Sequence, residues 1–204
     1  MSSSGRPGAP DVAGTVRLHR RDVVAALLAD RGDLLVVAGL GAPAWDCAAA
    51  GDHPLTFSFW GGMGLAAVTG LGLALARPGR RVLVVTGDGE MLMGLGSLAT
   101  IGVQAPPNLS VVVLDNERYG ETGMQPTHTA YGVDLAEVAE ACGFRAASTV
   151  RDADGIASLR DAIHRGAGPT FAVVKVEAEK PPLALPPREG VLLKGRFRAA
   201  LAGS

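Results

Sequence analysis

Two Val-rich runs in the middle of the chain end abruptly in polar residues. The first, RRVLVVTGDG, runs into Gly87-Asp88-Gly89, and the second, LSVVVLDN, runs into Asp115-Asn116. Short apolar runs of β-branched residues are typical of strands buried on both faces of a parallel sheet. Because the carboxyl ends of neighbouring parallel strands meet at one crevice, we expect Asp88 and Asn116 to lie close together, although they are 28 positions apart.

Helical and strand patterns alternate along the rest of the chain. LHRRDVVAALLADRG has the apolar spacing of an amphipathic helix with Val23, Leu27 and Leu28 facing inward, and DLLVVAGL follows it as a strand. The pair LAEVAEACG and FRAASTV repeats this order, as does the pair GIASLRDAIHRG and PTFAVVKVEA. The alternation predicts an α/β fold, in which a parallel sheet carries helices on both faces.

The two ends of the chain differ in composition from this central part. Residues 1–16 are small, polar and contain Pro and Gly, which predicts a disordered leader before a folded domain over residues 17–204. The prolines of KPPLALPPREG cannot continue a strand, because they lack backbone donors. This stretch is therefore expected to wrap the surface before a short terminal helix, VLLKGRFRAALA.

Charge and composition argue against several partners. The chain of 204 residues has 19 basic and 20 acidic residues, so no attraction to nucleic acid or to an anionic membrane is indicated. No apolar run reaches the about 20 residues that span a bilayer. The cysteines Cys47 and Cys142 stand apart and follow no secretory signal, which predicts a reduced, cytoplasmic setting.

The residues at the two strand ends suit a metal-bound diphosphate. Mg²⁺ prefers hard oxygen ligands, such as those of Asp88 and Asn116, and leaves positions for phosphate oxygens and water. Gly89 permits a close backbone approach, and a helix beginning near Glu90 would direct its free amides at the phosphates. GDG alone also fits an ordinary strand-to-helix turn, and a lone Asn116 fits a turn residue, so other segments have to agree.

Three segments together resemble the diphosphate-binding half of thiamine diphosphate (ThDP) enzymes, whose signature is GDG followed about two dozen residues later by Asn. FWGGMGLAAVTGLGLAL, residues 59–75, resembles the Gly-x-Met-Gly turn and helix of decarboxylases and acetolactate synthase. DNERYGETGMQPTHT, residues 115–129, resembles a loop of phosphonopyruvate and sulfopyruvate decarboxylases. The resemblance covers about residues 17–202 and comes nearest to the separate beta-subunit type of sulfopyruvate decarboxylase.

The resemblance implies a role for each motif residue. It gives Mg²⁺ three ligands from the chain, which are the Asp88 carboxylate, the Asn116 side chain and the Arg118 backbone carbonyl. It places Met63 beneath the cofactor as an apolar wedge, although Met also often fills cores. The other cofactor-binding residues that it implies are Gly61, Gly62, Gly87, Gly89, Glu90, Tyr119 and Gly120, with the Gly61 carbonyl accepting a hydrogen bond from the aminopyrimidine.

The resemblance also implies an enzyme that works with a second chain. In these enzymes a Glu of the pyrimidine-binding domain activates the cofactor, and 204 residues make only one domain. Glu90, Glu117 and Glu121 lie on the diphosphate side and are expected to be solvated or helix-capping. A separate alpha subunit should therefore supply the catalytic Glu, in an α₂β₂ or larger assembly.

The implied reaction is decarboxylation of a 2-oxoacid, a 3-substituted pyruvate of the sulfopyruvate or phosphonopyruvate type, to an aldehyde and CO₂. Glu117, Arg118 and Glu121 stand where the relatives tend to carry small residues and Ser, so the substrate stays open. Arg118 and His128 are candidates for substrate contact, and each also fits a solvated loop residue. Two alternatives remain: a subunit of an acetolactate synthase-like carboligase and a non-catalytic ThDP-binding module.

Overall fold

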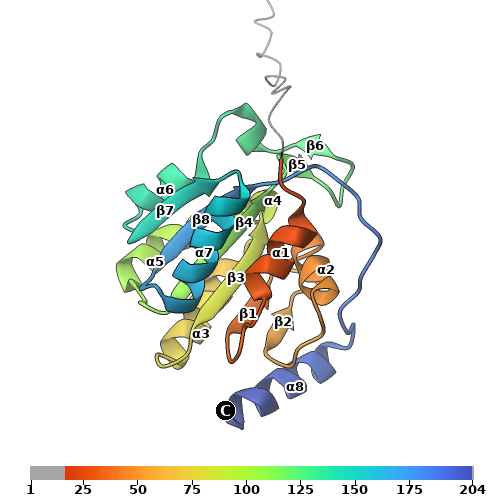
Figure 1. Ribbon diagram of the computed structural model, residues 1–204, viewed down its shortest axis with the longest axis vertical. Helices are drawn as coiled ribbons and strands as arrows, with labels where there is room; N and C mark the ends of the chain where they lie inside the picture. The colour runs from red at the N-terminus through yellow and green to blue at the C-terminus, as the bar shows by residue number, and fades with distance from the viewer. Residues whose placement is uncertain (1–16, 204) are drawn as a thin grey trace, which may run out of the picture.

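Six parallel strands form the centre of the computed structural model, which describes residues 17–203 (Figure 1). The strands are β1 Leu35–Ala38, β2 Thr56–Ser58, β3 Val82–Gly87, β4 Leu109–Asp115, β7 Ala146–Val150 and β8 Thr170–Lys175. Their order across the sheet is β2-β1-β3-β4-β8-β7. The two Val-rich runs are β3 and β4, which pair in parallel as far as Gly87 and Leu114, so the polar residues that follow both strands emerge at one edge. The predicted parallel sheet is confirmed.

Helices cover both faces of the sheet, as the alternating pattern predicts. One face carries α1 Arg20–Leu28, α2 Ala42–Ala49 and α7 Ala153–Arg165; the other carries α3 Ala66–Ala76, α4 Asp88–Met93, α5 Ser97–Gln104 and α6 Leu135–Ala141. Successive residues of β3 alternate between the two resulting cores. Val23, Leu27 and Leu28 of α1 are all buried, which confirms the predicted inward face of that helix.

The chain changes its direction of winding between β1 and β3. β1 pairs with β2 on one side and with β3 on the other, so the connections that follow β1 and β3 lead to opposite halves of the sheet. Ligands of open α/β sheets bind in the crevice beyond the carboxyl ends of the strands at such a point.

The short elements α2, β2 and α5 were not identified from the sequence. Neither was the hairpin of β5 Arg118–Tyr119 and β6 Gln125–Pro126, which precedes the 3₁₀ helix η1 His128–Tyr131.

The C-terminal stretch wraps the outside of the sheet, as its prolines predict. Residues 177–189 have no regular structure and run from the end of β8 along the side of the molecule to α8 Gly190–Ala202, which lies beside β2 (Figure 1). Side chains hold this stretch in place. Trp60 Nε1 donates to the Pro187 carbonyl over 2.9 Å, and Arg21 donates to the carbonyl of Pro182.

Several sequence-based expectations concern the ends of the chain and its setting. The predicted leader, residues 1–16, lies outside the described residues and stays a prediction. Cys47 and Cys142 are both free, and burial raises the pKa of the Cys47 thiol to about 12. Residues 17–203 include no helix with the length and hydropathy needed to cross a bilayer. The cytoplasmic setting stays a prediction.

Candidate functional site

A pocket opens at the carboxyl edge of the sheet, where the segments that follow β1, β3 and β4 meet. It gathers most of the residues that the sequence motifs predict: Met63, Gly87, Asp88, Gly89, Glu90, Asn116, Arg118, Tyr119 and Gly120. Gly61, Gly62 and His128 do not line it. The pocket is completed by Glu121 and by residues that no motif identified: Arg20, Leu40, Ala42, Pro43, Leu114, Thr122 and Val176.

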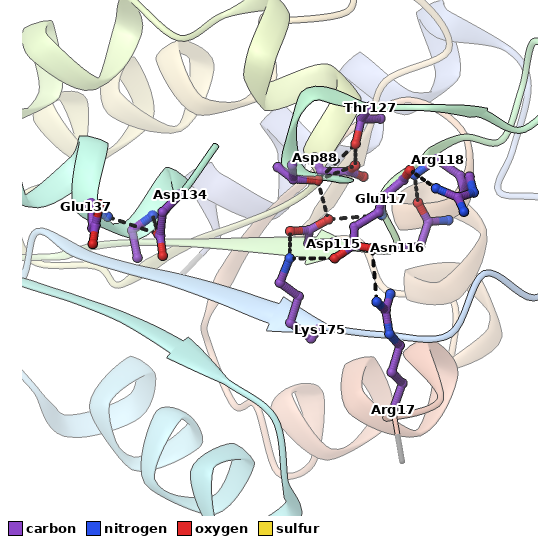
Figure 2. Close-up of polar contacts among 12 residues, drawn as sticks. Arg17, Asp88, Asp115, Asn116, Glu117, Arg118, Thr127, Asp134, Glu137 and Lys175 are labelled. Atoms are coloured by element: carbon purple, nitrogen blue, oxygen red, sulfur yellow. Dashed lines mark hydrogen bonds and ion pairs between the residues drawn. The ribbon is translucent and has the colours of Figure 1, made fainter. Parts of the chain in front are cut away.

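Asp88 is the first residue of α4, directly after β3, and only 2% of it is exposed. Its Oδ2 accepts a hydrogen bond of 2.6 Å from the Thr127 hydroxyl (Figure 2). Burial and the nearby Asp115 charge raise the pKa of Asp88 to about 7, against hydrogen bonds that lower it. A cation beside this carboxylate would stabilise its ionised form.

Asn116 follows β4 and begins a tight turn. Its Oδ1 accepts a hydrogen bond of 2.9 Å from the Arg118 amide, and Glu117 between them has a left-handed backbone with φ of 61°. One lone pair of the Asn116 amide oxygen is thereby used, and a second remains for a ligand. The turn therefore presents an amide oxygen to the same pocket as the Asp88 carboxylate.

Glu117 is absent from the lining of this pocket, and its carboxylate lies in a cluster of ion pairs (Figure 2). Its carboxylate lies 2.9 Å from Arg17 Nη2 and 3.0 Å from Lys175 Nζ. Lys175 also contacts Asp115 Oδ2 over 2.6 Å, while Asp115 Oδ1 accepts from the Glu117 amide. The expectation that Glu117 is solvated or helix-capping is therefore wrong: its carboxylate ties the Asn116 turn to β8.

Glu90 is also not solvated, because only 4% of it is exposed. Its carboxylate accepts hydrogen bonds from the Thr86 hydroxyl, at 2.8 Å, and from the amide of Ala66, at 3.3 Å. Ala66 is the first residue of α3, so helix capping fits Glu90 and a solvated role does not. Burial raises the pKa of this carboxyl, against these hydrogen bonds. Glu90 thus joins the GDG turn to the helix that follows GGMG.

Glycines of both motifs allow close packing around the pocket. A Cβ atom at Gly89 would lie 2.6 Å from a ring carbon of Tyr119, so only glycine fits beneath that ring. Gly62 and Gly64 have φ of 78° and 84°, in the left-handed region that glycine favours. A Cβ atom at Gly64 would lie 2.9 Å from the Gly94 amide nitrogen. The GGMG turn therefore packs against the end of α4, with Met63 in the pocket lining.

The sequence contains a signal for one of the lining segments that were not predicted, and none for another. Gly39-Leu40-Gly41 directly follows β1, and a glycine-containing segment at the end of a parallel strand is such a signal. Arg20 begins α1 and belongs to no motif. Its place in the pocket depends on contacts between distant parts of the chain.

The side chains present fit Mg²⁺ and a diphosphate. Asp88, Asn116 and a main-chain carbonyl would offer only oxygen donors, which is the set that Mg²⁺ prefers. Residues 17–203 hold no group of three or more His, Cys, Asp or Glu side chains placed for a metal, which excludes an alternative cluster of that kind within this range. A Cβ atom at Gly87 would meet nothing within 4 Å, so the backbone of the GDG turn borders open space for a ligand.

The fold and the pocket define an α/β protein with a cofactor-type site at the switch point of a parallel sheet. The sequence matches the family described as "Thiamine pyrophosphate enzyme, C-terminal TPP binding domain" over residues 41–176. It is 41% identical over 160 residues to the beta subunit of sulfopyruvate decarboxylase from Methanothermobacter thermautotrophicus, covering 78% of this chain and 83% of the relative. The chain therefore belongs to the thiamine pyrophosphate enzyme family.

Two further similarities involve longer proteins. Phosphonopyruvate decarboxylase from Streptomyces viridochromogenes is 43% identical over 139 residues, which cover 68% of this chain and 34% of that protein. A solved structure from Mycobacterium smegmatis, described as a thiamin diphosphate-dependent enzyme, superimposes with a TM-score of 0.68 at 24% identity and covers 83% of this chain. The matched part is 34% of that structure, so this chain spans about a third of both proteins.

Proposed function

We propose that this chain is the ThDP- and Mg²⁺-binding subunit of a two-subunit 2-oxoacid decarboxylase. Its substrate is a 3-substituted pyruvate of the sulfopyruvate or phosphonopyruvate type, and its products are an aldehyde and CO₂. One observation carries the proposal: Asp88 and Asn116, from the ends of adjacent strands, line one pocket with Met63 of the GGMG turn. The names of the relatives support the substrate class.

In this proposal each group of pocket residues has its own task. The Asp88 carboxylate, the Asn116 amide oxygen and the Arg118 carbonyl hold Mg²⁺, which binds the diphosphate. Met63 would support the organic part of the cofactor, and the Gly61 carbonyl, although Gly61 does not line the pocket of this chain, would accept a hydrogen bond from its aminopyrimidine. When bound, ThDP supplies an electron sink for cleavage of the bond to the carboxylate.

The activating acid comes from a second chain. Glu90 is held by Thr86 and Ala66, and Glu117 is held by Arg17 and Lys175, so neither carboxylate is free to approach a ligand. Glu121 lines the same pocket as the Asp88 carboxylate, on the side assigned to the diphosphate. We therefore place the catalytic Glu on an alpha subunit that carries the pyrimidine-binding domain, in an α₂β₂ or larger cytoplasmic assembly.

Of the two candidates for substrate contact, Arg118 is the better placed. Arg118 lines the pocket, although its Nη1 also donates to the Glu117 carbonyl over 2.9 Å. His128 lies outside the lining, with its Nδ1 3.5 Å from the Tyr119 hydroxyl. An anionic head group of the substrate would pair with Arg118 and be repelled by Glu121.

The test is reconstitution of activity from two chains. The chain is copurified with a candidate alpha subunit, and CO₂ release and 2-oxoacid consumption are measured with ThDP and Mg²⁺, with either chain omitted in turn. Aldehyde formation that needs both chains supports the proposal, and the preferred oxoacid identifies the substrate. Normal turnover by this chain alone would contradict the split site. A coupled C–C product would favour a carboligase, and cofactor binding without turnover a binding module.

A further inference from the structure

Arg20 enters the pocket from a part of the chain that carries no motif. It is the first residue of α1, only 5% exposed, and it lines the pocket together with Asp88 and Asn116. A backbone bridge between Leu18 and Val176 ties the segment before α1 to the end of β8, and Val176 lines the same pocket. The first turn of α1 is therefore fixed at the carboxyl edge of the sheet.

One buried hydrogen-bond donor of the Arg20 guanidinium, Nε, has no acceptor among the described residues. The Nη1 of the same guanidinium lies 3.3 Å from Oδ2 of Asp46. A guanidinium has five N–H donors, and leaving buried donors unpaired is costly. Arg20 therefore has at least one buried donor without an acceptor, and the residue borders the pocket.

Asp46 does not compensate the charge of Arg20 alone. This fully buried carboxylate also accepts a hydrogen bond of 3.2 Å from Arg21 Nε, so two arginines share one negative charge. The other charges nearby, His19 and Glu179, pair with each other over 3.0 Å. One carboxylate of α2 is thus shared by two arginines of α1, while the acidic residues Asp88, Glu90 and Glu121 lie in the same pocket lining as Arg20.

We infer that Arg20 is an anion-binding residue of the pocket and that its ligand is a phosphate oxygen of the cofactor diphosphate. The inference rests on the proposed function, since it concerns the same site. Arg20 and Arg118 are the only basic residues in the described lining, so they are the side chains there that can form an ion pair with a phosphate. An oxyanion of the substrate has the same chemistry as a phosphate, so the experiment has to separate the two sources.

Arg21 provides a matched control. It is the next residue of the same helix, pairs with the same Asp46 and donates to the Pro182 carbonyl, but it does not line the pocket. Arg20→Met and Arg21→Met each remove one cation from Asp46, so both disturb this ion-pair group. A difference between them in ligand binding therefore reports on the pocket. Arg20→Lys retains the charge and loses the planar donor group.

Binding is measured by calorimetry on the full chain in complex with its alpha subunit, with ThDP, inorganic diphosphate and unphosphorylated thiamine, each with Mg²⁺. We expect Arg20→Met to weaken binding of ThDP and of diphosphate by about tenfold or more, because a hydrogen bond to a charged group is lost. Arg20→Lys should lie between the wild type and Arg20→Met, thiamine binding should not change, and Arg21→Met should bind like the wild type. Thermal unfolding of each variant shows whether it is folded.

The outcomes separate this inference from the proposed function. Equal diphosphate binding by the wild type, Arg20→Met and Arg21→Met overturns the assignment to the cofactor. The second arm then measures KM with the two-chain complex at saturating ThDP. If Arg20→Met raises KM only for an oxoacid that carries a second anionic group, the residue binds the substrate. No change in either arm overturns the inference altogether. A wild-type two-chain complex that binds neither ThDP nor diphosphate contradicts the proposed function itself.

Discussion

The hydroxyl of Thr127 donates a hydrogen bond of 2.6 Å to Oδ2 of Asp88, across 39 positions of sequence. Thr127 is fully buried and lies between the β5–β6 hairpin and η1, and its amide binds the carbonyl of Glu117 over 3.0 Å. One residue thus holds both the carboxylate at the end of β3 and the turn at the end of β4. The hairpin that follows Asn116 fixes the relative position of the two proposed metal ligands.

This contact predicts the effect of removing the Thr127 hydroxyl. Thr127→Val keeps the shape of the side chain but leaves Asp88 without its shortest hydrogen bond. Partners of metal ligands typically contribute tenfold to a hundredfold in metal affinity. We expect Thr127→Val to weaken Mg²⁺-dependent ThDP binding by about tenfold or more, and Thr127→Ser to retain it. Titration of Mg²⁺ at fixed ThDP checks this, and equal affinities for all three proteins would contradict it.

The pKa of Asp88 predicts an unusual dependence of stability on pH for the metal-free chain. In the folded protein this carboxyl titrates at about 7, against 3.8 ordinarily, so the fold binds its proton more tightly than the unfolded chain does. The Asp88 contribution to the free energy of unfolding should therefore rise as pH falls from 8 towards 4. The gain is at most a few kcal/mol, because one pKa unit corresponds to about 1.4 kcal/mol.

Asp88→Asn isolates this contribution. Urea unfolding of both proteins in EDTA between pH 8 and 5 should show a gain in stability for the wild type relative to Asp88→Asn. His19, whose pKa is raised by Glu179, and His53, whose pKa is lowered by burial, are present in both proteins, so their contributions cancel in the comparison. Added Mg²⁺ at pH 8 should stabilise only the wild type. Parallel pH profiles would show that Asp88 is ionised throughout.

The backbone of Glu117 predicts a difference between two substitutions. Glu117→Ala and Glu117→Gly both remove the ion pairs to Arg17 and Lys175, which should cost about 1–3 kcal/mol. Only glycine adopts the left-handed conformation, φ of 61°, without a penalty. We therefore expect Glu117→Ala to be less stable than Glu117→Gly by about 1 kcal/mol, measured by urea unfolding at pH 7. The reverse order would contradict the strained turn.

The same ion pairs give Glu117 a defined dependence on acid. Burial would raise the pKa of its carboxyl, but hydrogen bonds from Arg17 and Lys175 outweigh this and lower it. Because the folded-state pKa is lowered, the ionised carboxylate stabilises the fold at pH values above its ordinary pKa of 4.5. This stabilisation is lost as the pH falls through the folded-state pKa. The stability difference between the wild type and Glu117→Gln should therefore shrink below about pH 4.5. A constant difference down to pH 3 would show that the ion pairs contribute little.

Local sequence was sufficient to predict the sheet and the edge where the pocket lies. The Val-rich runs before Asp88 and Asn116 are continuously apolar, which is typical of strands buried on both faces. Parallel strands then bring their carboxyl ends together. Both residues line one pocket, as that reasoning requires. The turn at the GGMG segment was implied by the family resemblance and not by local sequence, and Gly62 and Gly64 have the positive φ that a tight turn requires.

The contacts of Glu117 and Arg20 were not predictable from local sequence. Glu117 reads as a solvated loop residue, but Arg17 and Lys175 meet it from 100 and 58 positions away. Arg20 reads as one charge of an exposed helix start, yet its burial depends on Asp46 and on the bridge between Leu18 and Val176. A charge is placed by its partners, and those partners become neighbours only when the sheet is assembled.

The last prediction concerns Glu90 and Gly39. The Glu90 carboxylate lies so close to Gly39 that position 39 has no room for a larger side chain. A Cβ atom at Gly39, directly after β1, would overlap the carboxylate of Glu90, which is fixed by Thr86 and Ala66. Gly39→Ala should therefore displace this buried carboxylate and destabilise the fold by about 1–3 kcal/mol. Gly79→Ala is the matched control, since Gly79 also lies outside the helices and a Cβ atom there meets nothing within 4 Å.

Glu90→Ala alone should also destabilise the fold by about 1–3 kcal/mol, because it leaves the Ala66 amide and the Thr86 hydroxyl without their acceptor. In the double variant the alanine at position 39 no longer meets a carboxylate. The two losses should then sum to less than expected by at least about 0.5 kcal/mol, a coupling that residues in contact show and distant ones do not. Urea unfolding of the four proteins of this cycle measures the coupling. Additive losses would mean that the segment after β1 and the GDG helix do not constrain each other through Glu90.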